Sequence, residues 1–131
     1  MSAAKMIAVL ARCERAMQRN EALTVRIKAS LIRCRTVKAF SGATFLEKNA
    51  GGFFDGEGRI KTHLWEAYSE YDADEVSQEE HLRDPDDGCR HCYSAWRLVR
   101  LRKKARQELG AARRLVRHYG KEAIKAEKAA P

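Results

Sequence analysis

Apolar residues recur at alternating steps of four and three along the first forty positions of the chain. The seam they form contains Met6, Leu10, Cys13, Met17, Ile27, Leu31 and Cys34, with polar Asn20 and Thr24 near its middle. Residues 2–40 contain neither Gly nor Pro. The heptad spacing therefore predicts one long helix over residues 2–40, and a break near Asn20 into two shorter helices is the alternative.

A second seam of the same kind runs through the C-terminal part of the chain. Its members are Ala105, Leu109, Ala112, Val116, Tyr119 and Ala123. The pattern predicts a second long helix over residues 89–128, although Gly110 and Gly120 each cost such a helix about 1 kcal/mol relative to Ala.

The segment between the two seams differs in composition. Residues 41–62 hold five of the eight glycines and are typical of loop with short extended pieces, whereas the acidic residues 62–82 favour one short helix. Two long helices of similar length favour an antiparallel, coiled-coil-like hairpin. We therefore expect an all-α single domain, 1–131, with a small acidic, loop-rich middle segment at residues 41–88; a coiled-coil homodimer is the alternative to a monomer hairpin.

Charge divides the chain into the same three parts. Residues 1–50 carry 10 Lys/Arg against 3 Asp/Glu, residues 51–88 carry 3 against 12, and residues 89–131 carry 13 against 3. Two basic arms thus flank an acidic middle. This distribution is typical of a nucleic-acid-binding surface, and it also suits acidic residues that neutralise the arms within the molecule.

Two of the four cysteines form a CxxC pair, Cys89 and Cys92, just before the second long helix. Zinc needs two further ligands, and the predicted hairpin brings the end of the first helix to this point. The candidate ligand set is Cys89, Cys92, His81 and Cys34, with His63 as the alternative to Cys34; Cys13 is expected to be a small seam residue. We expect the zinc to be structural. Free structural cysteines and a redox pair are the other interpretations.

The sequence "DGCRHCYSAW", followed by "LRKKARQELGAARRLVRHYGK", resembles small accessory proteins of tailed phages and prophages. The similarity covers residues 86–121. It implies a phage-encoded helper, such as a host-takeover or anti-defence factor, acting in the host cytoplasm.

A second resemblance lies in "AGGFFDGEGRI", residues 50–60, which is similar to the motif of LAGLIDADG homing endonucleases. That resemblance implies that Glu57 binds a metal for DNA cleavage. The family's motif closes a helix and is followed by strands, whereas the residues after this one show no succession of strands. A glycine-rich hairpin turn, with Phe53 and Phe54 packed into the core, is the other interpretation.

Basic side chains line much of the predicted second helix: Arg97, Arg100, Lys103, Lys104, Arg113, Arg114, Arg117 and Lys121. Such a row neutralises phosphates without reading base sequence. We therefore expect a cytoplasmic, non-enzymatic protein that binds nucleic acid or a host nucleoprotein, with no membrane segment. A protein–protein inhibitor or adaptor acting through the seam of residues 6–34 is the alternative.

Overall fold

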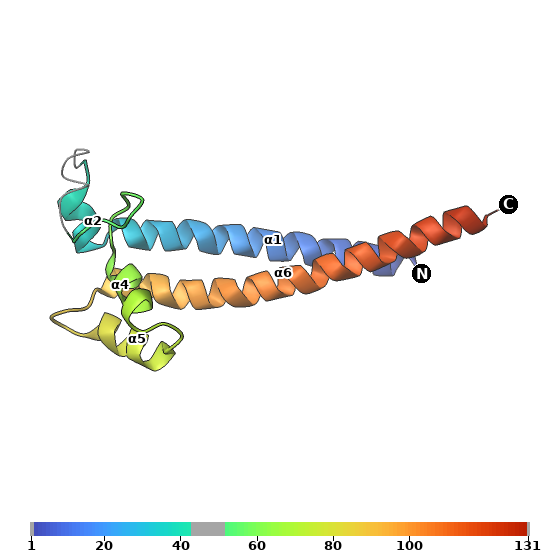
Figure 1. The fold of residues 1–131 in the computed structure, drawn as a ribbon. Helices are drawn as coiled ribbons and strands as arrows, with labels where there is room; N and C mark the ends of the chain where they lie inside the picture. Colours follow the sequence, from blue (N-terminus) through green and yellow to red (C-terminus); the bar gives the residue numbers. More distant parts are fainter. Residues whose placement is uncertain (1, 43–51, 131) are drawn as a thin grey trace. The chain divides into compact units, whose positions relative to one another are not determined.

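A computed structural model describes residues 2–42 and 52–130 of the chain (Figure 1). Its helices are α1 (Ala3–Ile32), α2 (Arg35–Phe40), α4 (His63–Glu70), α5 (Glu75–Arg83) and α6 (Arg90–Ala129). Within the described ranges, the one β-type pairing is an isolated bridge between Phe54 and Ile60. The predicted all-α class is confirmed. No described helix is both long enough and apolar enough to cross a membrane.

The chain divides into two compact units. The first comprises Met1–Thr24 with Arg100–Pro131, and the second comprises Val25–Val99. Helices α1 and α6 each contribute residues to both units.

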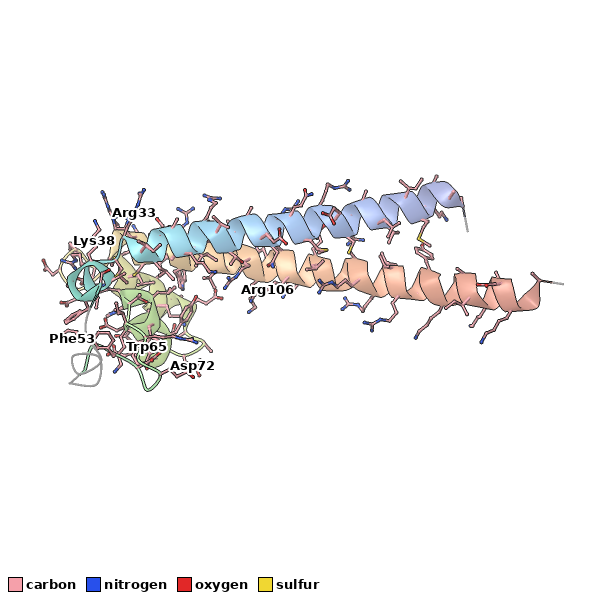
Figure 2. The ribbon with its side chains drawn as sticks, turned by 90° about the horizontal axis from the view of Figure 1, so that it is seen from above. Arg33, Lys38, Phe53, Trp65, Asp72 and Arg106 are labelled. Atoms are coloured by element: carbon pink, nitrogen blue, oxygen red, sulfur yellow. The ribbon has the colours of Figure 1, made fainter. Side chains whose placement is uncertain are left out.

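In the first unit, the early part of α1 and the later part of α6 pack against each other as antiparallel helices (Figures 1 and 2). Their buried contacts are made by alanines and leucines: Ala16, Leu23, Ala105, Leu109 and Ala112. Polar interactions between the two helices fix how they are aligned along their length. Arg19 and Arg12 lie 3.1 and 3.9 Å from the Glu108 carboxylate, and Arg102 donates to the Thr24 hydroxyl at 3.3 Å.

The second unit holds the larger buried side chains. Trp96 and Leu82 are almost fully buried, and Phe54, Leu64 and Leu98 are also buried. One buried polar side chain, Gln78, is bonded on both sides. Its Oε1 accepts from the Trp96 indole N–H at 2.9 Å, and its Nε2 donates to the Tyr71 carbonyl at 2.8 Å. This bridge connects α5 to the start of α6.

The first helix ends earlier than the predicted residue 40. Its last turn tightens, with the amides of Arg33 and Cys34 bonded to carbonyls three residues back. Cys34 then adopts φ −58° and ψ 136°, which is not helical, and α2 starts at Arg35. No glycine or proline marks this break, so the heptad pattern continues through it. The helix does pass unbroken through Asn20, as predicted.

The buried seam of α1 also differs from the predicted one by one residue at two positions. Ala16 and Leu23 are buried, whereas the predicted Met17 and Thr24 are half-buried and Leu10 is exposed. Ala16 and Leu23 keep the same four-three spacing through Asn20 and Ile27. On α6 the predicted Ala105, Leu109 and Ala112 are buried as expected.

The acidic segment at residues 62–82 forms two helices rather than the single one predicted. The interruption spans residues 71–74, where Ala73 has φ 60°. Asp74 caps α5 by accepting from the Ser77 amide at 3.1 Å and from the Ser77 hydroxyl at 2.7 Å. An aspartate that satisfies the first turn of a new helix is a strong reason for the chain to restart there.

Candidate functional site: a metal centre and a basic helix face

Four potential metal ligands meet in the second unit. The Sγ atoms of Cys34, Cys89 and Cys92 and a ring nitrogen of His63 all lie within 4.8 Å of one another. The three cysteines are buried, and His63 is half-buried. We call this group the Cys3His cluster. Within the described part of the chain it is the one grouping of three or more such residues.

Three separate elements supply the ligands. Cys34 lies at the non-helical residue between α1 and α2, and His63 is the first residue of α4. Cys89 directly precedes α6, and Cys92 is the third residue of that helix. The break between α1 and α2 therefore lies at one of the four ligands. The buried thiol at this break contacts His63 at the start of α4.

Local bonds hold each ligand in place. The Thr62 hydroxyl caps α4 by accepting from the Trp65 amide at 3.1 Å, which fixes where His63 begins the helix. Ahead of α6, the Gly88 amide donates to the Asp84 carbonyl at 2.9 Å, and the Cys89 amide donates to the Leu82 carbonyl at 3.1 Å. The turn that presents the CxxC pair is therefore fixed by backbone bonds.

The distances within the cluster suit tetrahedral zinc. A tetrahedron with Zn–S bonds of ~2.3 Å and a Zn–N bond of ~2.0 Å has edges of roughly 3.5–3.8 Å. The Cys34 Sγ lies 3.2 Å from His63 Nδ1, and the longest separation in the cluster is within 4.8 Å. Three thiolates and one imidazole also form a ligand set that zinc prefers for structural sites. The residues present therefore fit a zinc ion.

The electrostatics of the bare cluster show how closely the sulfurs are placed. A hydrogen bond from the Cys92 thiol, with smaller contributions from His63, lowers the pKa of Cys34 well below its ordinary value. The same bond, together with burial, raises the pKa of Cys92. A divalent cation bound to both sulfurs would take the place of the thiol proton.

The structure brings together three of the four predicted ligands, Cys34, Cys89 and Cys92, and completes the set with His63. His81 lies outside the cluster, where its ring packs on Tyr71 at 5.7 Å and its Nε2 lies 3.9 Å from the Glu66 carboxylate. Closeness to Cys89 in sequence favoured His81. The sequence signal for His63 is Thr62, directly before it, because a threonine that caps a helix marks where α4 begins.

Glu57, the acid implied by the endonuclease resemblance, lies in a turn. Asp55 Oδ1 accepts from the amides of Glu57 and Arg59, and the Glu57 side chain is exposed and paired with Arg59 at 3.2 Å. Phe54 is buried, whereas Phe53 is 55% exposed and stacks on Phe40. The chain here is a glycine-containing hairpin turn, and residues 50 and 51 of the motif lie outside the described residues.

The predicted basic residues of α6 are all exposed. Four of them, Lys103, Arg114, Arg117 and Lys121, fall within about 60° of the helix circumference at ~100° per residue. We call these four the basic face of α6; they belong to the first unit. The buried Ala105, Leu109 and Ala112 lie on nearly the opposite side. Among the residues that the structure describes, no ion pair involves any of the four.

Comparison with known proteins does not assign a function. No protein-family model matches the chain, and no curated protein or solved structure matches it. The case for function therefore rests on the cluster and on the basic face.

Proposed function

We propose that this chain is a non-enzymatic, zinc-stabilised helical protein that binds nucleic acid through the basic face of α6. The observation that carries the proposal is the row of four exposed cations opposite the buried side of the helix, none of which forms an ion pair within the described residues. The resemblance of residues 86–121 to small phage accessory proteins extends the proposal to a host nucleoprotein as the partner.

The zinc would be structural. Four protein ligands close the coordination sphere, so no position stays open for a water or a substrate, as catalytic zinc requires. Residues Cys34, His63, Cys89 and Cys92 would hold the ion and join three elements of the second unit. The ion would hold those three elements together by coordination and would take no part in a reaction.

Lys103 and Lys121, the two ends of the basic face, lie 18 positions apart on α6, or about 27 Å at ~1.5 Å per residue. Four cations that each neutralise one phosphate give a slope of log K against log salt of roughly −3.6. The affinity for duplex DNA should then fall about 150-fold between 50 and 200 mM salt. Residues 2–42 and 52–130 contain no helix-turn-helix and no aromatic platform beside the face, so we expect little dependence on base sequence.

The test is fluorescence anisotropy with labelled duplex DNA over that salt range. The variant Arg114→Gln/Arg117→Gln removes two charges and keeps good helix formers, so the slope should drop to roughly −1.8. The control variant Lys5→Gln/Lys28→Gln removes two exposed charges from α1 and should leave the slope unchanged. Binding that is absent at low salt, or equal in both variants, would refute the nucleic-acid proposal.

Zinc binding has its own test. Metal analysis should find one zinc per chain, and cobalt substitution should give the intense sulfur-to-metal absorption of a thiolate-rich site. His63→Gln should weaken metal binding, whereas His81→Gln should not. Equal effects of the two substitutions would contradict the assignment of His63 as a ligand.

A second candidate function, docking onto a protein through the seam of α1, retains one observation in its favour. Ile7 and Leu10 are 66% and 50% exposed, although the seam further along is packed within the first unit. If anisotropy shows no DNA binding, capture of a protein partner that is lost in Leu10→Gln would support this alternative.

A further inference from the structure

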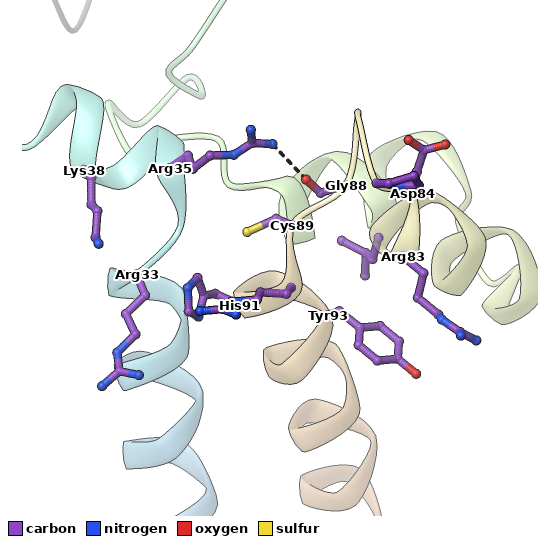
Figure 3. Close-up of a pocket in the computed structure, with 12 residues that line it drawn as sticks. Arg33, Arg35, Lys38, Arg83, Asp84, Gly88, Cys89, His91 and Tyr93 are labelled. Atoms are coloured by element: carbon purple, nitrogen blue, oxygen red, sulfur yellow. Dashed lines mark hydrogen bonds between the residues drawn. The ribbon is translucent and has the colours of Figure 1, made fainter.

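A cavity of about 520 Å³ lies beside the Cys3His cluster in the second unit (Figure 3). Arg33, directly after α1, and α2 supply one wall. The end of α5, the turn before α6 and the first residues of α6 supply the other. Its polar lining includes Arg33, Arg35, Lys38, Arg83, Arg90 and His91. We call this cavity the basic pocket. Its volume is within the range of roughly 300–1,000 Å³ that is usual for small-molecule sites.

The charge in the basic pocket is strongly one-sided. Five cationic side chains line it, against the single carboxylate of Asp84. That carboxylate already accepts the amides of Asp86 and Asp87 at 2.8 and 2.9 Å, so it is engaged within its own turn. Most of the cations come from the two basic arms, so the pocket is basic although it borders the acidic middle segment.

The five cations are not equally available. Arg35 donates to the Gly88 carbonyl at 3.0 Å, which fixes its guanidinium at the rim, and Arg83 pairs with Glu79 at 3.4 Å. In the described part of the chain, Arg33, Lys38 and Arg90 take part in no ion pair. Figure 3 shows Arg33 and Lys38 on the α1–α2 side, facing His91 at the start of α6.

Zinc alone does not account for this charge. Three thiolates bound to a divalent ion leave one negative charge on the centre, and the nearby cations would stabilise it. With Arg83 assigned to Glu79, four cations remain against Asp84 and that one charge. The pocket therefore keeps an excess of two positive charges.

The geometry points to a phosphate group as the ligand of the basic pocket. Guanidinium groups match phosphate oxygens in two-point hydrogen bonds, and a lysine adds a point charge. The first turn of α6 also contains no acidic residue, so its free amides add to the attraction for an anion. The phosphate can belong to a nucleic-acid strand, which rests on the proposed function, or to a free nucleotide.

The experiment uses the full, zinc-loaded chain. Inorganic phosphate is titrated into the labelled protein and followed in ¹H–¹⁵N spectra, with chloride at matched ionic strength as the reference. We expect phosphate-specific shifts at the amides of Arg90 and His91. Separate arms use a short oligonucleotide with and without a 5′-phosphate, duplex DNA, and a free nucleoside diphosphate, so that the source of the phosphate is identified.

The variant Arg33→Gln/Lys38→Gln removes two exposed pocket charges, and Arg15→Gln/Lys28→Gln removes two exposed charges elsewhere on α1. The pocket variant should lose about tenfold in affinity for the preferred phosphate compound, the size of one charge-assisted hydrogen bond, relative to the control. Zinc content and circular dichroism establish that both variants are folded.

The outcomes separate the two proposals. If DNA binds and the pocket variant behaves like its control, with no phosphate-specific shifts, the pocket inference is overturned while the proposed function stands. If DNA does not bind but a free nucleotide or phosphate does so through the pocket, the pocket inference stands and the proposed function fails. Shifts that chloride reproduces overturn the inference.

Discussion

A methyl group added at Gly88 should damage the Cys3His cluster. The φ of Gly88 lies outside the left-handed region, so the difficulty is space rather than backbone conformation. A Cβ there would overlap the carbonyl oxygens of Asp84 and Leu82 and would lie 2.8 Å from the Leu82 carbonyl carbon. All of these are backbone atoms, which cannot rotate aside as the end of a side chain can.

The size of the effect follows from these distances. Ordinary contacts of a Cβ begin at 3.4 Å, so the turn must open by about 0.6 Å at the Leu82 carbonyl carbon alone, and by more at the two carbonyl oxygens. Zinc–ligand distances are met within about ±0.2 Å, and Cys89 is the next residue along the chain. We therefore expect Gly88→Ala to weaken zinc binding tenfold or more, which corresponds to at least about 1.4 kcal/mol.

The control is the same substitution in α6. A Cβ at Gly110 would meet nothing closer than the end of the Arg114 side chain at 3.6 Å, so Gly110→Ala should raise the free energy of unfolding by about 1 kcal/mol. Zinc affinity is measured by competition with a chromogenic chelator, and stability by urea denaturation. Wild-type zinc affinity in Gly88→Ala would refute the steric reasoning.

Three further predictions concern stability. Removing zinc with a chelator should lower the free energy of unfolding by about 4 kcal/mol, if free zinc had been 1,000-fold above its Kd. In urea denaturation, Cys34→Ser should abolish this difference between the zinc-loaded and the chelated protein, whereas Cys13→Ser should not. Trp96→Phe leaves the buried Gln78 oxygen without its donor and should cost about 1–3 kcal/mol, read from the shift of the urea midpoint; an unchanged midpoint would contradict the bond. Hydrogen bonds from the Ser77 hydroxyl and, to a smaller extent, the Ser77 amide lower the pKa of Asp74 from its ordinary 3.8. The stability that the Asp74 cap contributes is therefore fully present above pH 3.8 and is lost as the pH falls through the pKa of Asp74 in the folded protein. The difference in urea midpoint between wild type and Asp74→Ala should shrink over that acidic range, and a constant difference would count against the cap.

The sequence predicted the two long helices well, because each buries a regularly spaced stripe of apolar residues. The heptad positions of α6 are buried where the pattern placed them, from Ala105 to Ala112. The end of α1 was predicted wrongly because Cys34 is compatible with a helix by local preference. Its non-helical backbone accompanies tertiary contacts with His63 and Cys92, which a local pattern does not contain.

The candidate site was predicted in part for a related reason. The CxxC spacing identifies Cys89 and Cys92 directly, and antiparallel helices bring the end of the first to the start of the last, which adds Cys34. Two histidines were available in the middle segment, and their order in sequence favoured His81. The division of that segment into two helices decides between them, and it depends on the Asp74 cap and on packing around Gln78.

The origin of the four ligands in distant parts of the sequence has a consequence for the order of folding. Helices form from contacts three or four residues apart, so α1 and α6 need little chain closure. The cluster instead joins residue 34 to residue 63 and to residues 89 and 92, so loops of more than twenty residues must close before the coordination sphere is complete. Zinc capture is therefore expected late, after the helices. A chain refolding without metal should regain its helical circular dichroism quickly, while the burial of Trp96 waits for the ion to arrive.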